Sequence, residues 1–296
     1  MLKSRAGFTV VEMVVALALT ATILALVSGI ALRQQRVIND LAEQRAVSAR
    51  LREASVLLPI QLRAAAPADL REATDTSLEL RSTIGVAIVC DTIASRIVLA
   101  PATPDDPRYA SFISPIEAGD SVWVLSNDGT GEEWRGTRVI DVGSQAPGPC
   151  NALGPGLSEA AQHVPRVALA LATMPAAPIG LPLRVTRPTR YSLYHASDGD
   201  WYLGERDWSN PLAQFATIQP LVGPFLKATS AGLSFRYADT TGAWLPTPVA
   251  DRTAVATIQV ALRAQTRSMA LAFAANGPAR EHVDSALLTI ALRNHP

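Results

Sequence analysis

Lysine is nearly absent from this chain of 296 residues, with Lys3 and Lys227 as its only examples. Basic and acidic residues balance at 26 each, so the formal net charge is +0. A nucleic-acid-binding protein normally gathers basic side chains on one face of the molecule. The composition does not favour that class, and we expect no nucleic-acid partner.

Histidine is also scarce, which limits the chemistry that the chain can perform. There is no H-E-x-x-H pair, no G-x-S-x-G elbow and no glycine-rich phosphate loop around the four histidines, which are His163, His195, His282 and His295. We interpret His195, at the end of an expected strand, as a surface side chain or a cross-strand partner of Trp201. The sequence therefore predicts no enzyme and no cofactor.

Only two cysteines occur, Cys90 and Cys150. In an oxidising compartment they could form a disulfide that closes a loop of about 60 residues and contributes roughly 4 kcal/mol. Two buried, unpaired thiols are the alternative. A zinc site is not favoured, because neither cysteine has a second cysteine or a histidine nearby.

Two acidic turns are the remaining places where a cation could bind. Asp128, Glu132 and Glu133 cluster in one turn, and Asp198 and Asp200 in another. Neither stretch has the alternating oxygen ligands and the closing bidentate glutamate of a dedicated calcium loop. We predict no metal site.

Charge is missing altogether from Met13 to Leu32, a run of twenty residues. A helix of that length rises about 30 Å, which matches the hydrocarbon thickness of a bilayer. A secretory signal peptide would have a shorter apolar part and a small-x-small cleavage site, which Val27–Ala31 matches poorly. We therefore predict a membrane helix that is retained.

The orientation of this helix is argued from the segments on its two sides. Lys3 and Arg5 precede the run, but more arginines follow it than precede it. The part that follows exceeds 200 residues, and long domains translocate largely regardless of their charge. We assign the short basic leader to the cytoplasm.

Glu12 stands at the edge of this apolar run. An unpaired carboxylate in hydrocarbon costs several kcal/mol, so acids within membranes usually have a partner and a function. The alternative is an interfacial glutamate whose carboxylate reaches the lipid headgroups.

The stretch Gly7–Glu12, GFTVVE, lies between a basic leader and an apolar helix, and it resembles the class III signal of type IV prepilins and type II secretion pseudopilins. The resemblance implies that a prepilin peptidase removes residues 1–7 by cutting between Gly7 and Phe8, and then methylates the new amine of Phe8. Glycine suits the cut because a backbone without a side chain can enter a narrow active site. The resemblance further implies that Glu12 pairs with the Phe8 amine of a neighbouring subunit and sets the axial register of a filament.

Residues 33–66 are expected to continue the transmembrane helix of residues 8–32. Apolar or small side chains recur with a period close to 3.6, at Val37, Leu41, Val47, Leu51, Ala54, Leu58 and Leu62. No proline occurs before Pro59, which we expect to kink or weaken the end of a rod about 75 to 80 Å long. The pilin resemblance predicts that this second half packs on a sheet.

Residues 67–296 are expected to form a β-rich head, which gives an α+β fold of pilin-like architecture. Short runs rich in β-branched residues predict strands at 77–81, 85–90, 96–99, 121–125, 137–142, 189–195, 201–203, 232–237, 254–263 and 286–292. Asp198-Gly199 and Asp128-Gly129 predict tight hairpin turns.

The stretches 233–237, 242–244 and 288–294 resemble those of W-type minor pilins and J-type pseudopilins. The resemblance implies a minor subunit held in the inner membrane with its head in the periplasm, later incorporated at a filament tip. Its partners would be the prepilin peptidase, other major and minor subunits and the inner-membrane assembly platform. The alternative function is a membrane-anchored periplasmic binding module that does not polymerise.

Overall fold

The computed structural model describes residues 9–103, 107–127, 132–150, 153, 157–174, 179–266 and 282–293. The chain divides into two compact units, residues 1–50 with 264–284, and residues 51–263 with 285–296. The leader charges Lys3 and Arg5 and the predicted cleavage residues Gly7 and Phe8 lie outside the described residues, as does the predicted turn at Asp128-Gly129.

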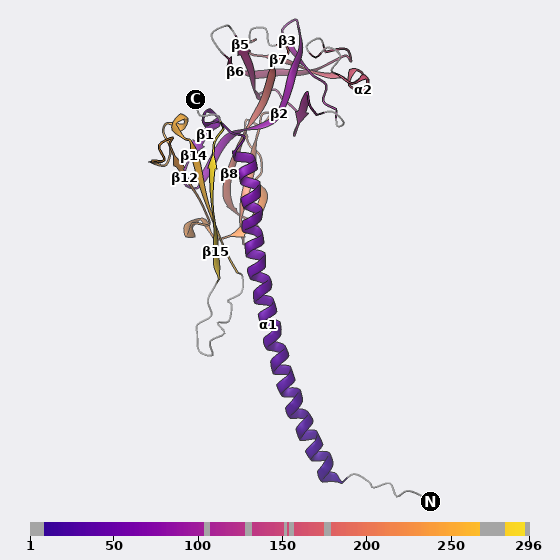
Figure 1. Cartoon of the computed structure of the whole chain (residues 1–296), viewed down its shortest axis with the longest axis vertical. Helices are drawn as coiled ribbons and strands as arrows, with labels where there is room; N and C mark the ends of the chain where they lie inside the picture. The colour runs from indigo at the N-terminus through magenta and orange to yellow at the C-terminus, as the bar shows by residue number, and fades with distance from the viewer. Residues whose placement is uncertain are drawn as a thin grey trace, which may run out of the picture. The chain divides into compact units, whose positions relative to one another are not determined.

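One helix, α1, runs without interruption from Val10 to Leu62 (Figure 1). Its 53 residues correspond to about 80 Å at 1.5 Å per residue, as the spacing predicts. Pro59 lies in the last turn and has no N–H to donate to the carbonyl of Ser55, so the helix loses one bond close to its end. The helix ends three residues later, at Leu62, so Pro59 is followed by the end of the helix rather than by a kink within it.

The predicted apolar face of the second half of α1 is buried from Val47 onward. Leu58 and Leu62 are among the largest fully buried side chains in the described residues. Leu41, which the same periodicity places on this face, is instead exposed. The amphipathic pattern was therefore correct for the last four turns of the helix but not for its middle.

Most strands of the head belong to one antiparallel sheet. Within the described residues its main path runs β1-β2-β3-β7-β6-β5-β8-β9-β10, with β4 on β2 and β11 on β9. The strands are β1 Leu70–Ala73, β2 Ser77–Ile93, β3 Arg96–Leu99, β4 Ala110–Phe112, β5 Ser121–Asn127, β6 Glu132–Gln145, β7 Arg166–Leu171, β8 Pro182–His195, β9 Trp201–Ser209, β10 Gln214–Phe215 and β11 Gln219–Phe225.

Strands β2 and β8 form the longest pairing of this sheet. It extends from Ser77 opposite Ser192 to Ile88 opposite Pro182. A register shift between Thr83 and Gly85 interrupts the ladder. The sequence predicted two strands here, 77–81 and 85–90, with a break between them. In the structure, β2 continues through this point and only its register with β8 shifts.

A second sheet has the order β13-β12-β14-β15 among the described residues. Its strands are β12 Leu233–Ala238, β13 Trp244–Leu245, β14 Thr257–Gln265 and β15 Val283–Ala291. The backbone N–H of Phe235 donates to Asp75, and the hydroxyl of Tyr237 donates to Thr74 at 2.8 Å. These bonds connect the second sheet to the segment between β1 and β2.

Short helices complete the described structure. The 3-10 helix η1, Pro67–Asp69, follows α1, and η3 and η4 cover Ala228–Ser230 and Arg252–Ala254. A single turn of α-helix, α2, covers Glu159–Gln162. Ser158 caps α2 by accepting a hydrogen bond from the backbone of Ala161.

The predicted disulfide between Cys90 and Cys150 is confirmed, with Cα atoms 4.9 Å apart. Both cysteines are buried in an apolar cluster to which β2, β3, β5, β6, β7 and β8 contribute. The alternative of two unpaired thiols is therefore wrong. The bridge ties the long segment after β6 to the carboxyl-terminal part of β2.

The hairpin predicted at Asp198-Gly199 is also confirmed. Gly199 has φ 87°, a conformation that glycine adopts without strain, and the carboxylate of Asp198 accepts the backbone N–H of Asp200. This turn joins β8 to β9 and places His195 opposite Trp201, with ring centroids 5.2 Å apart. His195 is thus the cross-strand partner that the sequence suggested.

Candidate functional site

The apolar part of α1 is the first candidate for function. Among the described residues, α1 is the one helix that is long and apolar enough to cross a membrane, and its most apolar window is wholly exposed. The hydroxyls of Thr20 and Thr22 donate to carbonyls one turn earlier, those of Ala16 and Ala18, at 2.8 Å. These two threonine hydroxyls are therefore satisfied within the helix, as a lipid environment requires.

Glu12 lies in the first turn of α1 and is bonded to Thr9. One carboxylate oxygen, Oε2, accepts the backbone N–H of Thr9 at 3.0 Å and its hydroxyl at 3.1 Å. In return, Thr9 Oγ1 accepts the backbone N–H of Glu12 at 3.3 Å. This reciprocal arrangement is a capping box, which satisfies backbone donors at the start of a helix.

The capping box was missed at the level of the sequence, although its signature was available. Thr9-Val10-Val11-Glu12 has the T-x-x-E spacing immediately before an apolar run. Its geometry leaves the second carboxylate oxygen, Oε1, without a partner among the described residues. Glu12 can therefore cap its own helix and still accept one further donor.

Apolar side chains are also exposed on α1 beyond the predicted membrane span. More than half of the surface of Ile38, Val56 and Ile60 is accessible, and nearly half of that of Leu41. A soluble helix normally turns such side chains inward. Exposed apolar side chains of this kind could be buried by packing against other helices.

The head contains a buried ion pair between Asp120 and Arg187. Asp120 is fully buried, and its carboxylate accepts Arg187 Nε and Nη2 at 2.8 Å each, Asn210 Nδ2 at 2.7 Å and the backbone N–H of Glu117 at 2.8 Å. Gly119, with φ 100°, makes the turn that presents this carboxylate. Hydrogen bonds to Asp120 raise the pKa of Arg187 and outweigh the opposing effect of burial.

A second polar contact inside the head joins β8 to β9. The buried hydroxyl of Tyr191 donates to Glu205 Oε1 at 2.9 Å. Burial is the main cause that raises the pKa of both groups, and the hydrogen bond from Tyr191 partly offsets the shift of Glu205. This pair connects two paired strands.

Candidate metal ligands are not brought together in the described part of the chain, where no group of three or more His, Cys, Asp or Glu could hold an ion. The carboxylate of Asp198 is used by Asp200 and by the hydroxyl of Tyr202 at 2.7 Å. The other acidic turn lies at the edge of the described residues, and Asp128 lies outside them.

No protein-family model, curated protein or solved structure matches this chain. Three features of the chain bear on its function: the motif before α1, the exposed apolar helix and the surface of the head.

Proposed function

We propose that this chain is a minor pilin or minor pseudopilin, a subunit processed by a prepilin peptidase and incorporated into a type IV pilus or a type II secretion pseudopilus. The precursor would lie in the inner membrane by a single pass with its head in the periplasm. The mature subunit would prime or occupy the filament tip. No catalytic activity is part of this proposal.

The observation on which this proposal rests is the position of Glu12. It lies in the first turn of a 53-residue helix, five places after the proposed cut that follows Gly7, and the next charged side chain is Arg33. A carboxylate at this place in an otherwise apolar segment costs free energy unless something binds it. A cut before Phe8 would create a primary amine four residues away from Glu12.

The geometry of the capping box is compatible with the proposed pairing. Thr9 occupies only Oε2 of Glu12, so Oε1 is open to a donor from another chain. The methylated amine of Phe8 keeps its positive charge, and a charged donor forms a stronger hydrogen bond than a neutral one. In this proposal, Thr9 holds the carboxylate at the end of the helix while a neighbour's amine binds its free oxygen.

The exposed apolar residues of α1 provide the second support. Ile38, Leu41, Val56 and Ile60 lie beyond residue 32, so a membrane anchor of residues 8–32 does not explain them. In a filament whose core consists of subunit helices, these side chains would be buried against neighbouring helices. A monomeric anchored module has no equivalent reason to expose them.

The test follows processing and incorporation of Glu12 and Thr9 variants in cells that contain the peptidase and the filament system. Mass spectrometry of the membrane and filament fractions reports the start of the chain, and immunoblotting of sheared filaments reports incorporation. We expect the wild-type protein to start at a methylated Phe8. Glu12→Ala and Glu12→Gln should be cut normally but incorporated poorly, since both lack the charge that binds an amine.

Thr9→Ala is the matched control. It removes the side chain that caps α1, at a cost of about 1 kcal/mol to the helix start, but it leaves the carboxylate in place. We expect it to be incorporated far better than either Glu12 variant. Normal incorporation of Glu12→Gln would refute the pairing, and a mature protein that keeps Met1 beside an active peptidase would favour the anchored binding module instead.

A further inference from the structure

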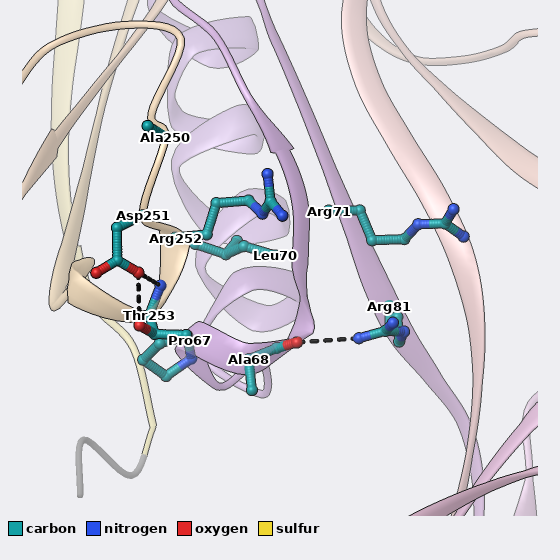
Figure 2. A pocket seen from close by; sticks show the side chains of 9 residues that line it. All are labelled: Pro67, Ala68, Leu70, Arg71, Arg81, Ala250, Asp251, Arg252 and Thr253. Carbon is teal, nitrogen blue, oxygen red and sulfur yellow. Dashed lines mark hydrogen bonds between the residues drawn. The ribbon is translucent and has the colours of Figure 1, made fainter.

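Two adjoining hollows lie on the head, within the unit of residues 51–263 and 285–296. The first has a volume of about 460 Å³ and is lined by Pro67, Ala68, Leu70, Arg71, Arg81, Ala250, Asp251, Arg252 and Thr253 (Figure 2). The second measures about 520 Å³, and Ala68 lines it as well. We call the two hollows together the Arg–Trp groove.

The first hollow has more positive charge than its own carboxylates neutralise. Three arginines and one aspartate line it, which leaves a formal charge of +2. Asp251 is turned toward Thr253, whose backbone N–H and hydroxyl both donate to Oδ1, at 3.0 and 2.6 Å (Figure 2). Arg71 is bound at 3.1 Å by Glu79, which lies outside the lining.

Arg81 and Arg252 are the cations that remain. Among the described residues, neither guanidinium has a carboxylate within ion-pair distance. Arg81 donates to the carbonyl of Ala68 at 3.0 Å, which orients its planar group beside the hollow (Figure 2). Burial, and then the positive charge of neighbouring arginines, lower the pKa of Arg81 despite the opposing effect of Asp69.

The second hollow adds an aromatic surface to this cationic one. Trp123 and Trp134 line it, and Trp134 is nearly half exposed. The guanidinium of Arg81 lies 5.7 Å from the ring centre of Trp123, so the two hollows meet at this cation–π contact. Arg184 lies over the same ring at 6.0 Å, but Asp69 holds it in a two-bond ion pair.

We propose that the Arg–Trp groove binds an acidic segment of a partner protein, with carboxylates on Arg81 and Arg252 and a neighbouring apolar side chain on Trp134. The planar fork of arginine matches a carboxylate with two parallel hydrogen bonds. Arginine and tryptophan are also the residue types most often found at the energetic centre of protein interfaces.

The size and walls of the groove favour a peptide over a single small anion. Each hollow falls in the range of about 300 to 1,000 Å³ that is typical of pockets for ligands much larger than phosphate. Pro67, Leu70 and Ala250 supply apolar walls beside the arginines, and Val86 extends the apolar side of the second hollow. This inference does not depend on the proposed filament function.

The test uses the full chain in an uncharged detergent and isothermal titration calorimetry at low salt. The probe is a blocked peptide of sequence Glu-Glu-Leu-Glu; its neutral match is Gln-Gln-Leu-Gln, and inorganic phosphate represents a single anion. We expect the acidic peptide to bind, the neutral peptide to bind at least about tenfold more weakly, and the affinity to fall as salt rises.

Arg252→Gln is the principal variant, because Arg252 is exposed and its loss leaves no described carboxylate unpaired. Arg252→Gln should lower the affinity for the acidic peptide by about tenfold, and Trp134→Ala should lower this affinity as well. Arg138→Gln is the matched control, an exposed arginine on β6 that lines neither hollow. Arg81→Lys keeps the charge without the fork and should have an intermediate effect.

The proposal fails if the acidic peptide does not bind, or if the neutral peptide binds equally well. It also fails if Arg138→Gln weakens binding as much as Arg252→Gln does, since charge anywhere on the head would then suffice. Binding of phosphate as tight as that of the peptide would reduce the groove to a site for a small anion and would overturn the assignment to a protein segment.

Discussion

Replacing Asp120 by asparagine removes one charge from the buried pair with Arg187. Asp120 is fully buried and the side chain of Arg187 is 10% exposed, so water cannot replace the lost interaction. Within the part of the chain that the structure describes, the groups that hydrogen-bond to this carboxylate are all donors: Arg187, Asn210 and the backbone of Glu117. An asparagine would turn its own N–H₂ group toward at least one of them.

The expected cost follows from this geometry. Breaking a buried ion pair by removing one partner costs about 3 to 5 kcal/mol, because the remaining buried charge loses its compensation. Arg187 would keep only the longer contact of its Nη2 with the partly exposed carboxylate of Glu117, at 3.6 Å. For a domain of 150 to 250 residues each kcal/mol lowers Tm by about 2 to 4 °C, so Asp120→Asn should lower the Tm of the head by about 6 to 20 °C. Thermal unfolding followed by near-ultraviolet circular dichroism measures this change.

Two further variants make the test of Asp120 sharp. Asp141→Asn breaks the exposed ion pair with Arg96, whose side chains are 58% and 39% exposed, and should cost less than about 1 kcal/mol. The double variant Asp120→Leu with Arg187→Met removes both charges and should recover part of the loss. A shift for Asp120→Asn no larger than that for Asp141→Asn would refute the argument.

Two predictions concern the covalent and titrating groups of the head. Replacing both Cys90 and Cys150 by alanine frees a loop spanning a sequence separation of 60 residues and should lower the free energy of unfolding by about 4 kcal/mol, visible as a lower urea midpoint; an unchanged midpoint would contradict this. Glu205 has a pKa raised above its ordinary value of 4.5, so the folded head binds more protons than the unfolded chain just above that pH, and its stability should fall as pH rises through this window. Glu205→Gln should flatten this part of the stability curve measured by urea unfolding, and an unaltered slope would argue against Glu205 as its source.

Local features of the chain were the ones that could be predicted. The apolar run and the absence of proline before Pro59 predict one long helix because helix formation depends on neighbours three and four residues away. The strand at Arg96–Leu99 was correct to the residue because its short apolar run is itself a local signal. Counting the cysteines left a single possible disulfide, Cys90–Cys150, with two unpaired thiols as the alternative, and the structure decided between them.

The strands that escaped prediction lack a local signal. β11 contains Pro220 and Pro224, which normally argue against a strand, but it lies at an edge and pairs only with β9 among the described residues. β7, Arg166–Leu171, is an apolar run without a clear alternation, so the spacing of its apolar residues does not distinguish a strand from a helix. Pairing with β3 and β6 makes it a strand, and those partners are distant in sequence.

The sequence alone determined the amino-terminal segment of this protein, an apolar helix with a glutamate at its start, because each feature is read from residues within one or two helical turns of each other. Only the tertiary structure decided that Arg81, Trp123 and Arg252 surround one groove and that Asp120 meets Arg187. Those residues lie far apart in the chain, and no local pattern records a contact that sheet pairing creates. The helix forms because of residues that are close together in the sequence, whereas the groove forms because residues that are distant in the sequence come together in the fold.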